Sequence, residues 1–432
     1  MSRFQVWLWV LTTAVLIPSE GCSDRRVEWL DEDAVRALEV LRWGSAREGG
    51  CGVETGVAEL DHQLTPLPHD SPVRFRRVLD LSLPAECQGY RHLAICADGK
   101  TVAAVCGGGH MARDVVHLFG VDERRGLHSL EPLHHNVGSV TAIAFLPPDE
   151  RLLIANVKGG KKAYVYLWDI RSGSAVQWVE VPDAGDEGIT GIAPLADGRR
   201  ILLCARTGLF VWDLQAGHLR QLSLEDHVVL RPGYPPQRPY CDQVASAGYG
   251  SRFVTRVGYM GVFEPRLLVW DAKTMVVTKA IVPYASCVRV AIAPDGTTLA
   301  GSYPCRTGRG TCVTVWDAAT GSPRASGLVF SDAREGVLTY SRDGNYLFAV
   351  GTHLGMGPPM QGEAYEPWAL GVWELATGKL AGSLSIKAIY LQLALSEDSK
   401  WLVVGNWRKI HIYRIEYAGD SKAGEEGSPA KP

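Results

Sequence analysis

The sequence has 432 residues, 21% of them charged, and a formal net charge of −3. This length is enough for one large or two ordinary domains, and the charged fraction is normal for a soluble globular protein. The negative balance excludes a globally basic surface of the kind that holds nucleic acid or an acidic membrane, so we expect no nucleic-acid partner.

Residues 1–22, MSRFQVWLWVLTTAVLIPSEGC, have the features of an export signal. Arg3 and the amino terminus form a short positive segment, and an apolar stretch of twelve residues follows from Val6 to Ile17. This stretch suits a signal peptide and is too short to span a bilayer comfortably. Pro18 then breaks the helix, and small residues follow at cleavage-site spacing. We predict a signal peptide over 1–22 and an exported protein in the periplasm or cell envelope.

Cys22 directly follows Gly21, and this pair resembles the lipobox of bacterial lipoproteins, in which the first mature residue is a lipidated cysteine. The resemblance implies a lipid anchor on Cys22, which is the only membrane attachment we expect. The chain departs from the family at Ser19, where leucine is usual, and at Glu20. Lipidation, ordinary cleavage and an uncleaved anchor therefore remain open.

Residues 27–46, VEWLDEDAVRALEVLRWGSA, form the only stretch with clear helical periodicity. Its aliphatic residues share one face, and Gly44 ends the pattern. We predict that residues 23–73 are a helical and linker segment. The tail over 418–432 is polar and rich in glycine, serine and proline, so we predict that it is disordered.

One pattern of strands and turns recurs along the rest of the chain. Around residue 290 the sequence reads CVRVAIAPDGTTLAGSYPCRTGRGTCVTVWDAATGSPRASGL, which contains four strands and turns at Asp295-Gly296 and Thr320-Gly321. The third strand of each of seven copies closes on a large aromatic residue. These aromatics are Phe119, Trp168, Trp212, Trp270, Trp316, Trp373 and Tyr413. From the second onward they lie 40 to 58 residues apart, around the ~40–45 residues of a propeller blade.

Each copy predicts a four-stranded antiparallel sheet. Its strands alternate in polarity or are wholly apolar, and the Asp-Gly turns supply the positive φ angles that tight hairpins need. Such a sheet cannot bury both faces alone, so the seven sheets should stack radially and cover one another. We expect the seven aromatics to fill the wedges between neighbouring blades.

These motifs resemble the WD-repeat family over roughly residues 76–417, and the resemblance implies a WD40-like propeller of a bacterial exported type. The Gly-His dipeptide that begins each repeat of the family is nearly absent, and only LHHNVGSV around His134 and His135 comes close. We therefore expect the blades to depend on apolar packing. The predicted fold class is all-β, a seven-bladed β-propeller of four-stranded antiparallel blades over 74–417, with a short N-terminal helix and an export signal.

Ring closure also follows from the pattern. The last copy ends near Tyr417 without a fourth strand, whereas the segment RFRRVLDLSL, residues 74–83, precedes the first copy and is typical of one strand. We predict that this segment pairs with the third strand of the last blade. That pairing would remove the exposed edges of an open ring.

The ten cysteines fit an oxidising compartment. Cys305 and Cys312 bracket the hairpin loop CRTGRGTC and are the predicted disulfide. Cys96 and Cys204 lie within apolar strand runs, and we interpret them as packing residues with free thiols.

Loop lengths differ between the two ends of the predicted blades. The turns after the first and third strands share one end and are short, as in ADG, PDG, RDG, QAG and ATG. Long segments belong to the other end. They cover residues 106–114, 156–162, 225–242, 258–266, 302–310 and 351–368. Variable loops on a rigid scaffold usually hold the binding residues, so we predict a binding face at the long-loop end.

Two of these long segments contain residue types that are enriched at interface hot spots, namely Tyr, Trp, Met and Arg. Proline among them lowers the cost of ordering on binding. The predicted binding residues are Arg231, Tyr234, Arg238, Tyr240, Met356, Met360, Tyr365 and Trp368. The alternative is that these loops cap the central channel and pack on each other.

The sequence lacks the linear motifs of common hydrolases, metalloproteases, nucleotide-binding enzymes and thiol oxidoreductases. We predict no catalytic or metal-ligating residues and no cofactor. The expected function is a non-catalytic protein- or peptide-binding scaffold, monomeric, in the bacterial cell envelope. The alternative is a propeller enzyme or small-ligand binder, such as a quinoprotein-like dehydrogenase or a lactonase, with its site at the mouth of the channel. A purely structural envelope module is a third possibility, because propellers host many functions.

Overall fold

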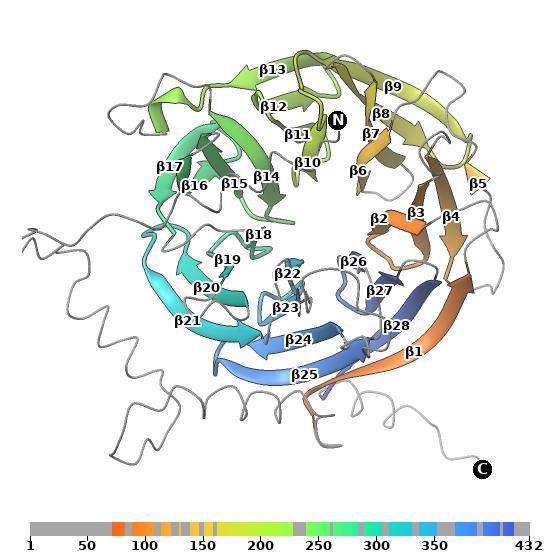
Figure 1. Ribbon diagram of the computed structural model, residues 1–432, viewed down its shortest axis with the longest axis vertical. Coiled ribbons are helices and arrows are strands. Elements are labelled where there is room, and N and C mark those ends of the chain that lie inside the picture. The colour runs from red at the N-terminus through yellow and green to blue at the C-terminus, as the bar shows by residue number, and fades with distance from the viewer. Residues whose placement is uncertain are drawn as a thin grey trace, which may run out of the picture. The chain divides into compact units, whose positions relative to one another are not determined.

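The computed structural model describes residues 71–82, 89–107, 114–121, 129–130, 139–146, 151–158, 162–227, 239–259, 262–283, 289–304, 311–330, 337–351, 368–386, 392–406 and 409–418. Within these residues, 28 strands form seven four-stranded antiparallel sheets that are arranged in a ring about one central axis (Figure 1). The predicted seven-bladed propeller is therefore confirmed. The predicted signal peptide, Cys22 and the helix over 27–46 lie outside the described residues.

The blades follow one another in chain order, and each begins with its innermost strand. Blade 1 comprises β2 (Gly89–Ile95), β3 (Thr101–Gly107), β4 (Val115–Gly120) and β5 (Ser129–Leu130); blade 2 comprises β6 (Ser139–Leu146), β7 (Arg151–Lys158), β8 (Lys162–Asp169) and β9 (Ser174–Val181). Blade 3 comprises β10 (Ile189–Pro194), β11 (Arg200–Ala205), β12 (Gly208–Asp213) and β13 (His218–Leu222), followed by the 3-10 helix η1 (Glu225–His227). Blade 4 comprises β14 (Tyr240–Ser246), β15 (Arg252–Tyr259), β16 (Val262–Asp271) and β17 (Val276–Ile281).

The remaining three blades complete the ring. Blade 5 comprises β18 (Arg289–Ile292), β19 (Thr298–Pro304), β20 (Thr311–Asp317) and β21 (Pro323–Phe330). Blade 6 comprises β22 (Leu338–Tyr340), β23 (Tyr346–Gly351), β24 (Trp368–Glu374) and β25 (Lys379–Ile386). Blade 7 comprises β26 (Gln392–Leu395), β27 (Trp401–Asn406), β28 (Lys409–Tyr417) and, from the other end of the propeller sequence, β1 (Val73–Ser82).

Strand β1 closes the ring as the sequence predicts. It pairs antiparallel with β28, from Val73 opposite Tyr417 to Ser82 opposite Lys409, and Figure 1 shows it along the outer edge of blade 7. Val73 is buried in the gap between blades 6 and 7, whereas Leu79 packs in the gap between blades 7 and 1. One strand therefore covers the outer edge of blade 7 and contributes to two inter-blade cores.

Seven apolar clusters fill the seven gaps between neighbouring blades. Each contains the marker aromatic of one blade together with aliphatic residues of the blade before it in the ring. The aromatics in these clusters are Phe119, Trp168, Trp212, Trp270, Trp316, Trp373 and Tyr413. Six of them are less than 9% exposed, and Phe119 is half-buried. The regular spacing of aromatics in the sequence thus corresponds to one packing position that is repeated around the ring.

The Asp-Gly turns between the first two strands share one hydrogen-bonding pattern. The aspartate accepts a hydrogen bond from the backbone N–H two residues later, and the following residue has a positive φ. The aspartates are Asp98, Asp197, Asp295, Asp343 and Asp398. Glycine occupies the positive-φ position in four of these turns, and in blade 7 Ser399 adopts φ 57° there. These turns are short because one side chain and one permissive backbone position suffice to reverse the chain.

The aspartate that follows the marker tryptophan caps the turn between the third and fourth strands. Asp213, for example, accepts hydrogen bonds from the N–H groups of Gln215 and Ala216 at 2.9 Å each. Equivalent bonds are made by Asp169, Asp271 and Asp317. The Trp-Asp pair therefore combines an inter-blade wedge with a turn cap.

Cys96 is a buried free thiol, as predicted, but it does more than pack. Its Sγ donates to Asp98 and accepts the N–H of Thr101 at 3.0 Å. Ser341 in blade 6 and Ser396 in blade 7 make the same two contacts in their own turns. Cys96 therefore occupies a position at which the repeat otherwise uses a serine hydroxyl.

We expect Cys96→Ser to change the free energy of unfolding by less than about 0.5 kcal/mol, because serine already serves at this position in two blades. Cys96→Val should cost about 1–3 kcal/mol, since the N–H of Thr101 loses its acceptor in a buried turn. Urea unfolding of the two variants checks this, and equal stability of both would contradict the assigned role of the sulfur.

The interpretation of Cys204 as a free packing thiol is wrong. Cys204 on β11 and Cys241 on β14 form a disulfide between blades 3 and 4. Burial alone does not distinguish a free thiol from a disulfide-bonded cysteine, and both cysteines are fully buried among apolar residues. Cys106 and Cys312 are each in a disulfide as well. Cys305, the predicted partner of Cys312, lies outside the described residues.

Among the described residues, the structure contains no helix with the length and hydrophobicity that a membrane span requires.

Candidate functional site

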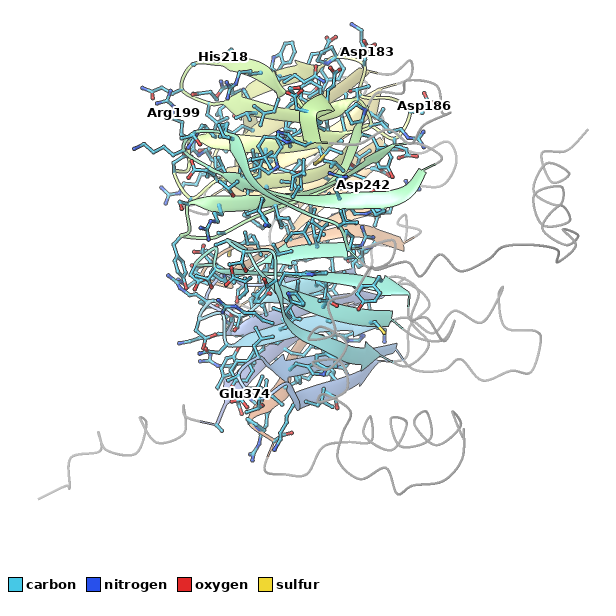
Figure 2. All side chains as sticks on the ribbon, turned by 90° about the vertical axis from the view of Figure 1, so that its left-hand side faces the viewer. Asp183, Asp186, Arg199, His218, Asp242 and Glu374 are labelled. Atoms are coloured by element: carbon cyan, nitrogen blue, oxygen red, sulfur yellow. A yellow bond between two sulfur atoms is a disulfide. The ribbon has the colours of Figure 1, made fainter. Side chains whose placement is uncertain are left out.

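The two ends of the propeller differ in the connections that emerge there. The turns between first and second strands and those between third and fourth strands share one end, here called the short-turn face. Figure 2 shows Arg199, His218 and Glu374 on this side of the blades, with Asp183 and Asp242 towards the opposite, long-loop face. Backbone hydrogen bonds join the two kinds of turn, such as Leu214 N–H to Arg199 C=O at 3.0 Å.

Most of the predicted binding residues lie outside the described part of the chain. These are Arg231, Tyr234, Arg238, Met356, Met360 and Tyr365. Tyr240 is the first residue of β14, and Trp368 is the first residue of β24. Both strand ends belong to the long-loop side, but blades 4 and 6 are separated by blade 5. The structure thus gives two attachment points for the predicted binding segments.

An ion pair lies beside Tyr240 at the long-loop end of blade 4. The Arg256 guanidinium contacts the Asp242 carboxylate, and both side chains are mostly buried. Burial raises the pKa of Asp242, and the neighbouring Arg256 opposes this shift. Burial also raises the pKa of the Tyr240 hydroxyl. The pair fixes the start of β14 and hence the exit of the link over 225–242.

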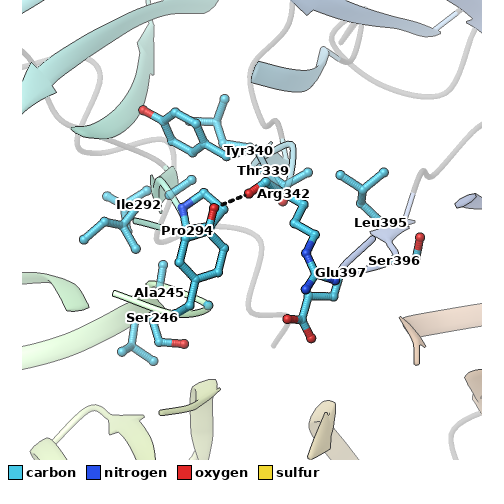
Figure 3. Close-up of a pocket in the computed structure, with 16 residues that line it drawn as sticks. Ala245, Ser246, Ile292, Pro294, Thr339, Tyr340, Arg342, Leu395, Ser396 and Glu397 are labelled. Carbon is cyan, nitrogen blue, oxygen red and sulfur yellow. Dashed lines mark hydrogen bonds between the residues drawn. The ribbon is translucent and has the colours of Figure 1, made fainter. Parts of the chain in front are cut away.

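Hydrogen bonds between blades brace the short-turn face. Arg342 of blade 6 donates its N–H to the Ser399 hydroxyl of blade 7 at 2.6 Å. Tyr249 of blade 4 reaches past blade 5, and its hydroxyl donates to the Arg342 carbonyl at 2.6 Å, shown as the dashed line in Figure 3. Further bonds join blade 4 to blades 3 and 5 and blade 7 to blade 1. These contacts make this end a rigid surface.

A cavity of about 340 Å³ opens at the mouth of the channel on this braced face. Its wall comes from the inner strands and first turns of blades 4 to 7, and Figure 3 shows Pro294, Tyr340, Arg342 and Glu397 around it. The volume is at the small end of the range for ligand sites. Each inner strand is the end strand of its sheet and pairs with only one other strand. On β18, the Val290 N–H donates to the Gln243 side chain of blade 4.

The residues at the rim of this cavity differ from those at the equivalent turn positions of other blades. Blades 1 and 3 have Ala97 and Ala196 immediately before the turn aspartate, whereas blades 6 and 7 have Arg342 and Glu397 there. Blade 4 has Tyr249 where the other described first turns have aspartate, and this residue is 56% exposed. A base, an acid and an aromatic ring therefore stand at one mouth of the channel, each on a turn that is fixed by hydrogen bonds.

The charges at this mouth are not neutralised by one another. Arg342 and Glu397 are both exposed, and neither forms an ion pair within the part of the chain that the structure describes. In the same turn as Arg342, the pKa of Asp343 is lowered, because hydrogen bonds from Ser341 and Asn345 outweigh the opposing effect of burial. Asp343 is thus a structural carboxylate of this turn, whereas Arg342 and Glu397 are exposed and line the cavity.

The alternative prediction placed a small-ligand site at the mouth of the channel, but the residues of this cavity were not predicted, because loop length pointed to the opposite face. The informative signal was the substitution of Arg, Glu and Tyr into short turns whose other copies hold Ala and Asp. Conversely, the predicted wedge aromatics are accounted for by inter-blade packing and take no part in the cavity.

The turn-capping aspartates predict a specific acid sensitivity. A hydrogen bond from Arg199, with help from the Ala216 N–H, lowers the pKa of Asp213 below its ordinary value of 3.8. A lowered folded-state pKa contributes stability above the unfolded pKa, and this stability is lost as pH falls through the folded value. We expect the stability advantage of the wild type over Asp213→Asn to be constant near neutrality and to shrink below about pH 4. Urea midpoints measured across pH check this, and an advantage that does not change with pH would contradict it.

No protein-family model matches the chain, and no curated protein matches it. The resemblance to WD-repeat propellers therefore depends on the motifs of the chain and on the architecture that they produce.

Proposed function

We propose that this protein is a WD40-like propeller that serves as a non-catalytic protein- or peptide-binding scaffold in the bacterial cell envelope, with its partner on the long-loop face. The observation that carries the proposal is the asymmetry of the two ends. The described turns of the short-turn face are tight and braced between blades, whereas the long segments leave from the opposite ends of the strands. Variable segments on such a scaffold usually hold the binding residues.

The disulfides support an envelope location. Cys204 is bonded to Cys241. Cys106 and Cys312 are each in a disulfide as well. Structural disulfides persist in oxidising compartments such as the periplasm and are rare in the cytosol. This agrees with the export signal predicted over residues 1–22.

The attachment of the link over 225–242 supports the choice of face. Cys241 anchors the link to blade 3 through the disulfide, and the ion pair of Asp242 with Arg256 holds the next residue. An anchored, proline-rich link loses less conformational freedom on binding than a free one. We place Arg231, Tyr234 and Arg238 among the residues that contact the partner.

The test compares two triple variants of the full chain as bait in envelope extracts. The first replaces Arg231, Tyr234 and Arg238 with alanine. The matched control makes the same replacement at Lys273, Lys379 and Lys400 on the short-turn face. We expect the first variant to lose a partner that the control retains, and the purified partner should then bind the wild type directly. Equal recovery by both variants would overturn the choice of face, and absence of any direct partner would overturn the scaffold role.

A small-ligand binder is the second candidate, because the cavity at the short-turn mouth has a ligand-sized volume. Ligand sites combine an apolar wall with a few placed polar groups. In this cavity, the apolar wall comes from Ile292, Leu338 and Leu395. The polar groups come from Arg342 and Glu397.

A further inference from the structure

We propose that the cavity at the short-turn mouth binds a short peptide with free ends, of the size of a dipeptide or tripeptide. This site is separate from the macromolecular face proposed above, since the two lie at opposite ends of the channel. Its ligand class follows from the charges at the rim, the backbone edges of the wall and the volume.

The rim offers one partner for each end of such a peptide. The Arg342 guanidinium matches a terminal carboxylate, with which it can form paired hydrogen bonds. The Glu397 carboxylate matches a terminal ammonium group. The two residues occupy the same position in the first turns of adjacent blades, and Figure 3 shows them on the same side of the cavity. Opposite charges held on neighbouring turns favour a ligand that itself has both charges.

The wall suits the middle of a peptide. Strands β18, β22 and β26 each pair with only one other strand, and the backbone donors and acceptors along such an edge can hydrogen-bond to peptide groups. One donor of β18, the Val290 N–H, is already bonded to the Gln243 side chain. Ile292, Leu338 and Leu395 supply apolar surface for an aliphatic side chain. A cavity of about 340 Å³ limits the ligand to a few residues.

The site is preorganised by hydrogen bonds between turns of different blades. The Tyr249 hydroxyl bonds to the Arg342 carbonyl, and the Arg342 N–H bonds to Ser399, both at 2.6 Å. These bonds fix the backbone of the turn that presents the guanidinium. In blades 1 and 3 the equivalent residues are Ala97 and Ala196, so among the described first turns only those of blades 6 and 7 have a charged residue at this position. Rigid presentation lowers the entropic cost of binding a small ligand.

The experiment titrates the full chain with the dipeptide alanyl-leucine by calorimetry, alongside its N-acetylated and C-amidated forms. We expect the free dipeptide to bind and each capped form to bind about tenfold more weakly, as for the loss of one hydrogen-bonded charge. Arg342→Gln should abolish the discrimination against the amidated form, and Glu397→Gln should abolish the discrimination against the acetylated form.

Lys400→Gln is the control, because Lys400 is exposed in the same turn as Glu397 but does not line the cavity. It should bind all three peptides like the wild type. No heat of binding at millimolar dipeptide, or equal affinity for free and capped forms, would overturn the proposal. The triple variant of Arg231, Tyr234 and Arg238 should bind the dipeptide normally, so failure here is distinguishable from failure of the scaffold role.

Discussion

Replacing Trp212 with alanine is expected to lower the free energy of unfolding by about 3–5 kcal/mol. Trp212 has no exposed surface and packs in the gap between blades 2 and 3 with residues such as Leu153, Val165 and Leu203. The gap is bounded by two rigid sheets that cannot close over the space left behind. The cost therefore combines lost transfer free energy with a retained cavity. Urea unfolding of the purified variant measures it.

Trp178→Ala is the matched control. Trp178 lies on β9 and is 58% exposed, and its ring contacts Tyr164 rather than filling an inter-blade gap. Its removal should change the free energy of unfolding by no more than about 0.5 kcal/mol, as for most surface substitutions. Equal losses from Trp212→Ala and Trp178→Ala would show that the wedge position has no special role in stability.

Substitution by phenylalanine separates the packing contribution of a marker tryptophan from the contribution of its indole hydrogen bond. The indole N–H of Trp270 donates to the buried Thr255 hydroxyl at 2.9 Å, whereas that of Trp212 has no partner among the described residues. Trp270→Phe should thus cost about 1–3 kcal/mol more than Trp212→Phe, because only the former strands a buried hydroxyl. The reverse order would contradict this assignment.

The regular parts of the fold were predictable because they repeat. The aromatic that closes each third strand, the Asp-Gly turns and the extra strand over 74–83 each appear in the sequence with the periodicity of their structural role. A position used seven times is visible even when single copies diverge, as Phe119 and Tyr413 do. Apolar packing in seven equivalent gaps then determines the ring.

The irregular parts were less predictable, because they depend on which residues meet across a gap. Cys204 lies in an apolar strand, whereas Cys241 is followed by Asp242 and Gln243. Both cysteines are fully buried, and neither sequence pattern distinguishes a buried thiol from a buried half-cystine. Their pairing depends on the alignment of β11 with β14, which no local pattern specifies. The cavity is similar, because Tyr249, Arg342 and Glu397 come from three separate turns. Only comparison between the copies of the repeat could have singled them out.

The double substitution Cys204→Ala and Cys241→Ala is expected to lower the free energy of unfolding by about 4 kcal/mol. The two cysteines are 37 residues apart, and a crosslink that closes a loop of this length removes that much conformational entropy from the unfolded chain in the loop-closure account. The loop contains η1 and the link to blade 4, so the disulfide also holds the segment for which we propose partner contact. Urea unfolding of the oxidised wild type and of the double variant measures the difference.

A reductant provides the complementary measurement on the same proteins. Reduction should destabilise the wild type but should affect the double variant less, because the variant has already lost the crosslink between blades 3 and 4. Cys96→Ala serves as the control for loss of a buried sulfur, since Cys96 is a free thiol and closes no loop. If the double variant were no less stable than Cys96→Ala, the apolar gap between blades 3 and 4 would suffice to hold them together. The disulfide would then act mainly on the link, where its loss would weaken partner binding and leave global unfolding unchanged.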